Sequence, residues 1–338
     1  MPAKLVIPSP FVAPPAQPRP VVVWVLARPG DAGLHVLNPP PEGVRFVVGS
    51  EPEAFDDAPP PDAVLDCWSG RRRIAGVLER APELPWFHSR SAGLDTVLVP
   101  ELVASSAILT NGRGAFSSSL AEFVVASLLY FVKDLRRLVK SQEAGTWDPF
   151  DMEMLYGRTL GIVGYGDIGR AAAERVRPLG MKVLALRRRT ERSVGDPLVD
   201  EALPPERLNE LMARADDVLV ALPLTKDTRG LVDEAALGTM KPGGVLVNVG
   251  RGAVVDEAAL LEALREGRIR GAALDVFETE PLPADHPLWS LPNVLLAPHC
   301  ADNVPGWVED SMHVFLKNLD LFRRGETLLN VADKSRGY

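Results

Sequence analysis

The sequence predicts an α/β protein of two domains, with a parallel sheet in the larger one. The chain has 338 residues, a length that corresponds to about two domains. Short β-branched runs alternate with stretches of helical periodicity along most of the chain. A glycine-rich loop near residue 164 stands between such a run and a helical stretch. Strands that alternate with helices form a parallel sheet with right-handed crossovers.

Composition excludes several classes of protein. The net charge of −8 argues against binding to duplex nucleic acid, because phosphate contacts need a basic surface. Two cysteines, Cys67 and Cys300, are too few for a disulfide scaffold or a multi-cysteine zinc site. No apolar run is long enough to span a membrane, and the proline-rich N-terminus does not resemble a secretory signal. We therefore expect a cytoplasmic protein with no membrane or nucleic-acid partner.

The first part of the chain predicts a small α/β domain. Of the 31 prolines, 15 precede Asp62, and they punctuate short apolar runs. These runs predict strands at 21–26, 44–48, 63–65 and 84–88, the last with an edge-like Pro85, and a helix at 71–79. For residues 1–20, a disordered leader is an equal alternative.

A long helix is expected to begin near Ser117. Ser119 and Glu122 have the spacing of a capping box. Apolar residues then continue on almost every side as far as Leu138, which is typical of a helix buried between domains or between subunits. A homodimer is one interpretation, and burial by the chain's own domains is the other.

The remainder of the chain predicts a regular β–α repeat. The closing amphipathic helix runs from Val308 to Phe322 and ends before Gly325. The other expected helices lie at 168–179, 205–215, 234–240 and 257–266, and the strands at 159–163, 182–186, 217–222, 244–249, 272–276 and 294–297.

The glycine-rich loop has the spacing G-x-G-x-x-G. Gly164 would permit a tight turn, Gly166 would let a pyrophosphate approach the backbone, and Gly169 would let the helix pack on the strand. Asp167 and Ile168 open the helix, whose N-terminus would face the phosphates. The position between a strand and a helix predicts a Rossmann dinucleotide-binding domain; a glycine-rich turn without a ligand is the alternative.

The end of the next strand bears on the choice of dinucleotide. NAD enzymes place an acidic residue there, about 20 residues after the loop, to bind the ribose hydroxyls. This chain has Arg187, Arg188 and Arg189 instead. Guanidinium groups suit a phosphate better than a diol, so we expect NADP(H), with NAD(H) possible. A solvated arginine run is the alternative.

Three polar segments follow late strands, where ligands bind in open α/β sheets. They contain Arg251, then Glu278 and Glu280, then His299. An arginine can bind a carboxylate and polarise a carbonyl, a histidine can transfer a proton, and an acid can favour the charged imidazole. His299 beside Cys300 is not a metal site, because two further ligands are missing. The other histidines, His35, His88, His286 and His313, are expected to be structural or exposed.

These motifs resemble the D-isomer-specific 2-hydroxyacid dehydrogenases, in particular the glyoxylate/hydroxypyruvate reductase type. The similarity runs from about Phe87 through the final helix. It implies a Rossmann domain (113–303) inserted into a smaller flavodoxin-like substrate domain (1–112 plus 304–338), and a homodimer. It also implies an NAD(P)-dependent oxidoreductase acting on a small 2-oxo or 2-hydroxy acid.

The resemblance further implies residue roles. Arg251 would orient the 2-oxo acid, His299 would be the acid/base, and Glu280, directly before Pro281, would pair with it. Glu278 competes with Glu280 for this role. Asp275 would hold the nicotinamide carboxamide. Backbone groups of the substrate domain would bind the substrate carboxylate at Ala92 and Gly93, and the cofactor would also be flanked by Leu222, Pro223, Thr228, Val249 and Gly250.

Two departures leave the substrate open. Ala297 stands where the family often has threonine, and residues 300–303 replace a commoner Ala-Gly segment. Other 2-hydroxy acids, such as phosphoglycerate, are alternatives within the family, whereas Glu280 argues against a formate enzyme. Outside catalysis, a Rossmann redox sensor or corepressor without turnover is the alternative.

Overall fold

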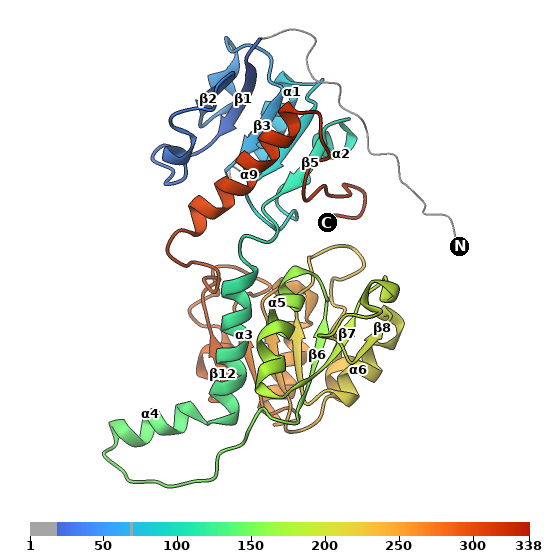
Figure 1. The fold of residues 1–338 in the computed structure, drawn as a ribbon. Helices are drawn as coiled ribbons and strands as arrows, with labels where there is room; N and C mark the ends of the chain where they lie inside the picture. Colours follow the sequence, from blue (N-terminus) through green and yellow to red (C-terminus); the bar gives the residue numbers. More distant parts are fainter. Residues whose placement is uncertain (1–18, 68–69) are drawn as a thin grey trace, which may run out of the picture. The chain divides into compact units, whose positions relative to one another are not determined.

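The computed structural model describes residues 19–67 and 70–338 (Figure 1). The chain divides into two compact units, Met1–Ala115 with Pro305–Tyr338 (unit 1) and Phe116–Val304 (unit 2). The alternative of a disordered leader applies to residues 1–20, of which the structure describes only Arg19 and Pro20. In the described ranges, no helix has the length and apolar character needed to cross a membrane.

Unit 1 contains a five-stranded parallel sheet in the order β2-β1-β3-β4-β5. Apart from short 3-10 turns, the described part of this unit contains three helices. The strands are β1 (Val21–Leu26), β2 (Val44–Gly49), β3 (Ala63–Asp66), β4 (Trp86–Ser89) and β5 (Ile108–Asn111), and the helices are α1 (Arg71–Arg80), α2 (Pro100–Ala104) and α9 (Trp307–Arg323).

Alternate residues of β1 build two different cores. Val22, Trp24 and Leu26 pack with residues of α1 and α2. Val21, Val23 and Val25 point to the opposite face, because successive side chains of a strand alternate. That face is covered by α9, which returns from the far end of the chain and lies across the sheet in Figure 1. Unit 1 is therefore discontinuous in sequence.

Unit 2 contains a seven-stranded parallel sheet in the order β12-β11-β10-β9-β6-β7-β8. The order reverses next to β6, which is the point where doubly wound sheets bind ligands. The strands are β6 (Thr159–Val163), β7 (Lys182–Leu186), β8 (Glu201–Leu203), β9 (Asp217–Val220), β10 (Val245–Asn248), β11 (Gly271–Leu274) and β12 (Val294–Leu296). The helices are α3 (Ser117–Val132), α4 (Leu135–Glu143), α5 (Asp167–Val176), α6 (Leu208–Arg214), α7 (Glu234–Thr239) and α8 (Glu257–Arg265).

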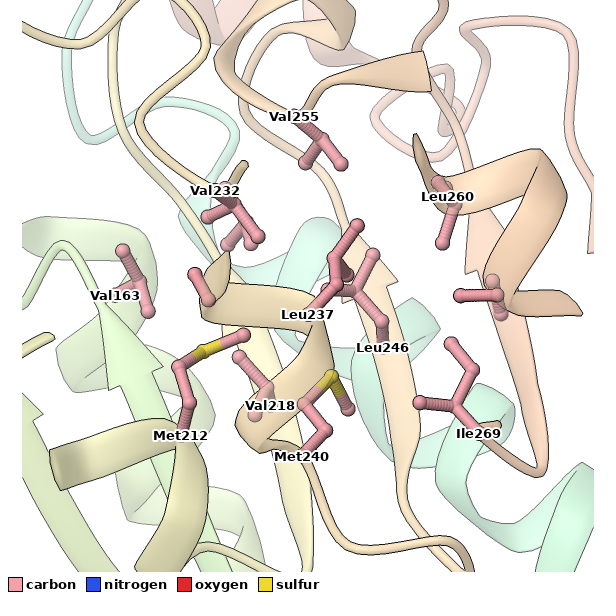
Figure 2. Close-up of a cluster of buried hydrophobic side chains, with 14 of the residues drawn as sticks. Val163, Met212, Val218, Val232, Leu237, Met240, Leu246, Val255, Leu260 and Ile269 are labelled. Atoms are coloured by element: carbon pink, nitrogen blue, oxygen red, sulfur yellow. The ribbon is translucent and has the colours of Figure 1, made fainter. Parts of the chain in front are cut away.

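One core of unit 2 lies where α6, α7 and α8 cover the sheet. Figure 2 shows Met212, Leu237 and Leu260 of these helices around Val218 and Leu246 of the strands. On another part of the sheet, α3 packs closely: a Cβ on Gly271 of β11 would lie 2.4 Å from the Phe131 ring. This contact buries Phe131, near the end of α3, against the sheet of its own unit.

The prediction of one helix from Ser117 to Leu138 is wrong in two details. The helix begins at Ser117 without a side-chain cap, and the Ser119 hydroxyl donates to the carbonyl of Ala301 instead of closing a capping box. It ends at Val132, because Asp134 adopts a left-handed conformation (φ 45°) and caps α4 by accepting from Arg137.

Other boundaries also differ from the sequence expectation. Pro85 does not mark an edge strand: β4 pairs on both sides, with β3 and β5, and begins one residue after the proline. The helix expected at 205–215 begins as a 3-10 turn, with α6 starting at Leu208. The short elements α2, β5 and β8 are absent from the sequence prediction.

Candidate active site

The glycine-rich loop connects β6 to α5 and has room for a ligand at one glycine. Gly164 has a φ of 105°, and a Cβ there would lie 2.8 Å from the Ala221 carbonyl oxygen. A Cβ on Gly169 would lie 2.7 Å from the Gly164 oxygen, so α5 approaches the strand closely. Gly166 is exposed, and its Cβ position has no atom within 4 Å. The open space at Gly166, beside the N-terminus of α5, fits a pyrophosphate.

The side chain that follows β7 is fixed by two contacts. Arg187 donates to the Ser193 hydroxyl at 3.0 Å, and its guanidinium lies 5.6 Å from the centre of the Tyr165 ring. Tyr165 belongs to the glycine-rich loop and donates to Asp196 at 3.2 Å. Burial is the main cause that raises the pKa of Tyr165 to about 12, and the carboxylate of Asp196 is the second cause. Arg187 is thus half-buried and held near the loop, whereas Arg188 and Arg189 are exposed.

The loops after β9 and β10 pack on each other. A Cβ on Gly250 would lie 2.6 Å from the carbonyl oxygen of Leu222, so only glycine fits there. The Thr228 hydroxyl donates to the Pro223 carbonyl at 2.6 Å and fixes the first loop. Four of the residues expected at the cofactor, Leu222, Pro223, Thr228 and Gly250, therefore belong to one packed edge; Val249 precedes Gly250 there and is buried.

Arg251 is positioned by its neighbours on both sides. Asn248 is buried, and its amide donates to the Arg251 carbonyl at 3.2 Å while its oxygen accepts from Gly250. A Cβ on Gly252 would lie 1.9 Å from the carbonyl carbon of Phe277. The loop that carries Arg251 is thereby pressed against the loop that follows β11.

Glu280 and His299 form a direct contact. Glu280 Oε2 and His299 Nδ1 are 2.6 Å apart, and Glu280 Oε1 accepts from the Phe277 N–H at 2.9 Å. The Glu280 hydrogen bond raises the pKa of His299 above its usual value. Burial acts to raise the pKa of Glu280, but the hydrogen bonds from His299 and Phe277 hold it below its usual range. The contact of His299 is with Glu280 and not with Glu278, although both residues are exposed.

Asp275 organises the loop that carries His299. Its Oδ1 accepts from the backbone N–H groups of Cys300 and Ala301, at 2.9 and 3.1 Å. His299 has a φ of 51°, which a non-glycine residue adopts only when its surroundings support it. Burial raises the pKa of Asp275 to about 6. Sequence reasoning places Asp275 near the cofactor but misses this contact with the histidine loop.

Ala92 and Gly93 lie on the loop after β4, in unit 1. The Asn111 amide donates to the Ala92 carbonyl at 2.7 Å, and the Gly112 N–H donates to Ser91. These contacts tie the loop to the end of β5. The partner Asn111 is the last residue of a strand that the sequence pattern does not reveal, and Gly112 follows it directly.

The remaining histidines and cysteines have other environments. His88 is fully buried, and burial lowers its pKa to about 3. His35 and His313 are exposed, and His286 lies 3.2 Å from Glu257. Burial raises the pKa of the Cys67 thiol to about 12. No group of three or more metal-binding side chains occurs in the part of the chain that the structure describes.

Comparison with known proteins decides the family. Residues 125–301 match the family described as "D-isomer specific 2-hydroxyacid dehydrogenase, NAD binding domain". The glyoxylate reductase of Thermococcus onnurineus is 37% identical over 80% of this chain and 83% of that protein. The chain belongs to this dehydrogenase family. The D-3-phosphoglycerate dehydrogenase of Methanocaldococcus jannaschii is 34% identical over 80% of the chain, which spans about half (51%) of that protein.

Solved structures of this dehydrogenase family share the fold. A probable 2-hydroxyacid dehydrogenase from Rhizobium etli, in complex with NADP, HEPES and L(+)-tartaric acid, gives a TM-score of 0.83 at 26% identity and covers 95% of this chain and 100% of its own. An NADPH-dependent glyoxylate/hydroxypyruvate reductase from Sinorhizobium meliloti, in complex with NADP and sulfate, gives 0.80 at 26% identity with the same coverage. The matches confirm the predicted family, the α/β fold with its NAD-binding domain, and the assignment as a dehydrogenase.

Proposed function

We propose that this dehydrogenase reduces a small 2-oxo acid, of the glyoxylate or hydroxypyruvate type, to the D-2-hydroxy acid, and catalyses the reverse oxidation. The contact of 2.6 Å between Glu280 and His299, on loops fitted against the one that carries Arg251, carries this proposal. A histidine whose pKa is raised is protonated near neutral pH and can serve as a general acid. A guanidinium can both bind a carboxylate and stabilise charge on a carbonyl oxygen.

In the reduction, each residue has a distinct task. NADPH, when bound, supplies the hydride that adds to C2 of the oxo acid. His299 donates the proton on Nε2 to the carbonyl oxygen, which becomes the hydroxyl, because its Nδ1 faces Glu280. Arg251 orients the substrate, and the N–H groups of Ala92 and Gly93 bind its carboxylate. In the oxidation, neutral His299 accepts the hydroxyl proton.

The preference for NADPH rests on Arg187. Its guanidinium is positioned by Ser193 and Tyr165 at the end of β7, where NAD enzymes carry an acid. We propose that it binds the 2′-phosphate, with Arg188 and Arg189 adding positive charge, and that NAD(H) is a weaker alternative. Gly164, Gly166, Gly169 and the start of α5 at Asp167 and Ile168 would hold the pyrophosphate, and Asp275 the carboxamide. The free cysteines Cys67 and Cys300 fit a reducing cytoplasm.

The direct test follows NADPH absorbance with glyoxylate, hydroxypyruvate and bulkier 2-oxo acids. We expect rapid oxidation of NADPH with at least one acid. His299→Ala and Arg251→Ala should lose about 10²- to 10⁴-fold in kcat while still binding NADPH, because each acts on the reacting carbonyl. His313→Ala, which changes an exposed histidine of α9, is the matched control. Dinucleotide binding without turnover of any acid would instead indicate a sensor or corepressor.

The cofactor assignment is tested with the same assay. Arg187→Gln should lower kcat/KM for NADPH about 10- to 100-fold, the size of one charge-assisted hydrogen-bonded pair, and leave NADH much less affected. Arg192→Gln, an exposed arginine five residues further along, is the control. Faster turnover with NADH than with NADPH in the unmodified protein would contradict the assignment and leave the catalytic residues untouched.

A further inference from the structure

Unit 1 contains a cavity of about 250 Å³ to which the proposed reaction assigns no role. It lies beyond the carboxyl ends of β1, β3 and β4, the edge where parallel α/β sheets bind ligands. Its walls include Arg28, Asp31, Cys67, Arg90, Trp307 and Val308. The cavity is thus built from three strand ends and the start of α9.

Two of these side chains form a fixed wall. Arg90 donates to both carboxylate oxygens of Asp31, at 2.6 and 2.8 Å, and the two side chains are only 3% and 10% exposed. Gly33 covers the pair so closely that a Cβ there would lie 2.9 Å from Arg90 Nη1. Asp66 is buried at the end of β3 near Arg90 but does not line the cavity. The carboxylate of Asp31 is therefore committed to Arg90.

Arg28 is the cation that remains for a ligand. It is exposed at the cavity, and within residues 19–67 and 70–338 its guanidinium makes no hydrogen bond, although its charge helps to lower the pKa of Asp31. Asp31, the carboxylate of the cavity wall, already has its two oxygens on Arg90. Trp307 and Val308 are the first residues of the 17-residue helix α9, whose positive dipole end adds to the charge of Arg28, while Glu309 and Asp310 of the same first turn offset part of it. A negatively charged group is the partner that this arrangement favours.

One residue of the cavity wall, Arg90, is close in sequence to the proposed carboxylate site. Arg90 stands two residues before Ala92, and Gly112 holds this segment so tightly that a Cβ would lie 2.2 Å from the Arg90 carbonyl oxygen. A substrate whose first carboxylate is bound at Ala92 and Gly93 would therefore have the cavity beside it. Glyoxylate has no carbon beyond C2 and would leave the cavity without a ligand.

We infer that this cavity binds the far end of the substrate and that Arg28 selects a 2-oxo acid with a second anionic group, a carboxylate or a phosphate. The inference rests on the proposed reaction and narrows its substrate class. A guanidinium accepts both anions, so the two sources are separated by experiment.

The test compares pairs of acids in which one member carries an additional terminal anionic group. 2-Oxobutanedioate is compared with 2-oxobutanoate, 2-oxopentanedioate with 2-oxopentanoate, and phosphohydroxypyruvate with hydroxypyruvate. We expect the charged member of at least one pair to have a kcat/KM at least about 10-fold higher, with Arg28→Gln reducing that ratio about 10-fold, toward equal kcat/KM for the two members. The pair with the largest ratio identifies carboxylate or phosphate. Arg72→Gln, an exposed arginine of α1, should keep the ratio.

Two results would overturn the inference: equal kcat/KM within every pair, or a ratio that Arg28→Gln leaves intact. If the unmodified protein turned over none of these acids, and glyoxylate neither, the result would contradict the proposed reaction instead. In that case calorimetry of 2-oxopentanedioate and of phosphohydroxypyruvate with the NADPH-bound protein still decides, because binding needs no turnover. A weaker affinity in Arg28→Gln for either acid supports the cavity as an anion site, and equal affinities for both overturn it.

Discussion

His299 depends on one neighbour for its proton. Glu280 raises the pKa of His299, so reduction should proceed at a constant kcat/KM at low pH and fall as pH rises through that pKa. Glu280→Gln removes the main cause of the raised pKa, so the descending limb should move to lower pH and activity at neutral pH should drop. A kcat/KM profile over the neutral and alkaline range measures the shift.

Glu278→Gln is the matched control for this profile, because Glu278 is exposed two residues before Glu280. It should leave the descending limb in place. If both variants give the unmodified profile, the limb belongs to another group and His299 loses its assigned role. If the descending limb of the profile moved only in Glu278→Gln, Glu278 and not Glu280 would be the partner of His299.

At the residue scale, the sequence pattern predicts the residues of the candidate site better than the contacts that hold those residues in place. The acid before Pro281 contacts His299, as its position indicates, and Gly164, Gly166 and Gly169 have the three environments expected of them. The contact of Asp275 with the backbone of Cys300 and Ala301 could not be predicted. It joins the ends of β11 and β12, and the register of two strands is a property of the folded sheet.

At the element scale, strongly exposed apolar side chains gather on α4 and the segment after it, and none lies on α3. Val139 of α4 is 53% exposed, and Trp147, Met154 and Tyr156 are 95%, 65% and 74% exposed. Figure 1 shows α4 and this segment projecting from the sheet of unit 2. Arg137 orders the projection by pairing with Asp148 and stacking on the Phe150 ring at 4.2 Å. Such a patch favours a partner surface, and we propose a second copy of the chain.

Charge introduced in this patch should separate the two copies. We expect Val139→Asp and Trp147→Asp to convert a dimer into a monomer, because each would bury an unpaired carboxylate at the interface. Sedimentation velocity measures the change. Val103→Asp, an exposed apolar residue of α2, should remain dimeric. A monomeric unmodified protein would contradict the proposal, and so would a dimer that both charged variants retain.

Long, repeated elements could be predicted and short ones could not. Strands β6, β7 and β10 and helix α8 follow clear apolar patterns, so their existence is fixed by local sequence. β8 has three residues and β5 ends in Thr110 and Asn111, which are buried only because they pair and pack in the folded unit. The break at Asp134 was also hidden, since the apolar residues continue across it into Leu135 and Leu138.

At the scale of the molecule, the two units differ in how the chain builds them. Unit 2 is one continuous segment with its own core and the complete glycine-rich loop. Unit 1 needs α9, which supplies the buried Met312, Phe315, Leu319 and Phe322 to one face of its sheet. Burial of four such side chains contributes about 6–12 kcal/mol, comparable with the whole stability of a typical domain, about 5–15 kcal/mol.

Truncation should therefore separate the units. We expect a chain that ends at residue 304 to lose the structure of unit 1, because one face of its sheet would be exposed, and to keep the fold of unit 2. A fragment of residues 116–304 should give cooperative thermal unfolding, and NADPH should raise its Tm, since a ligand that binds only the folded state stabilises it. A fragment of residues 1–115 without α9 should not unfold cooperatively. Cooperative unfolding of that fragment, or a 116–304 fragment that neither folds nor binds NADPH, would show that the units depend on each other.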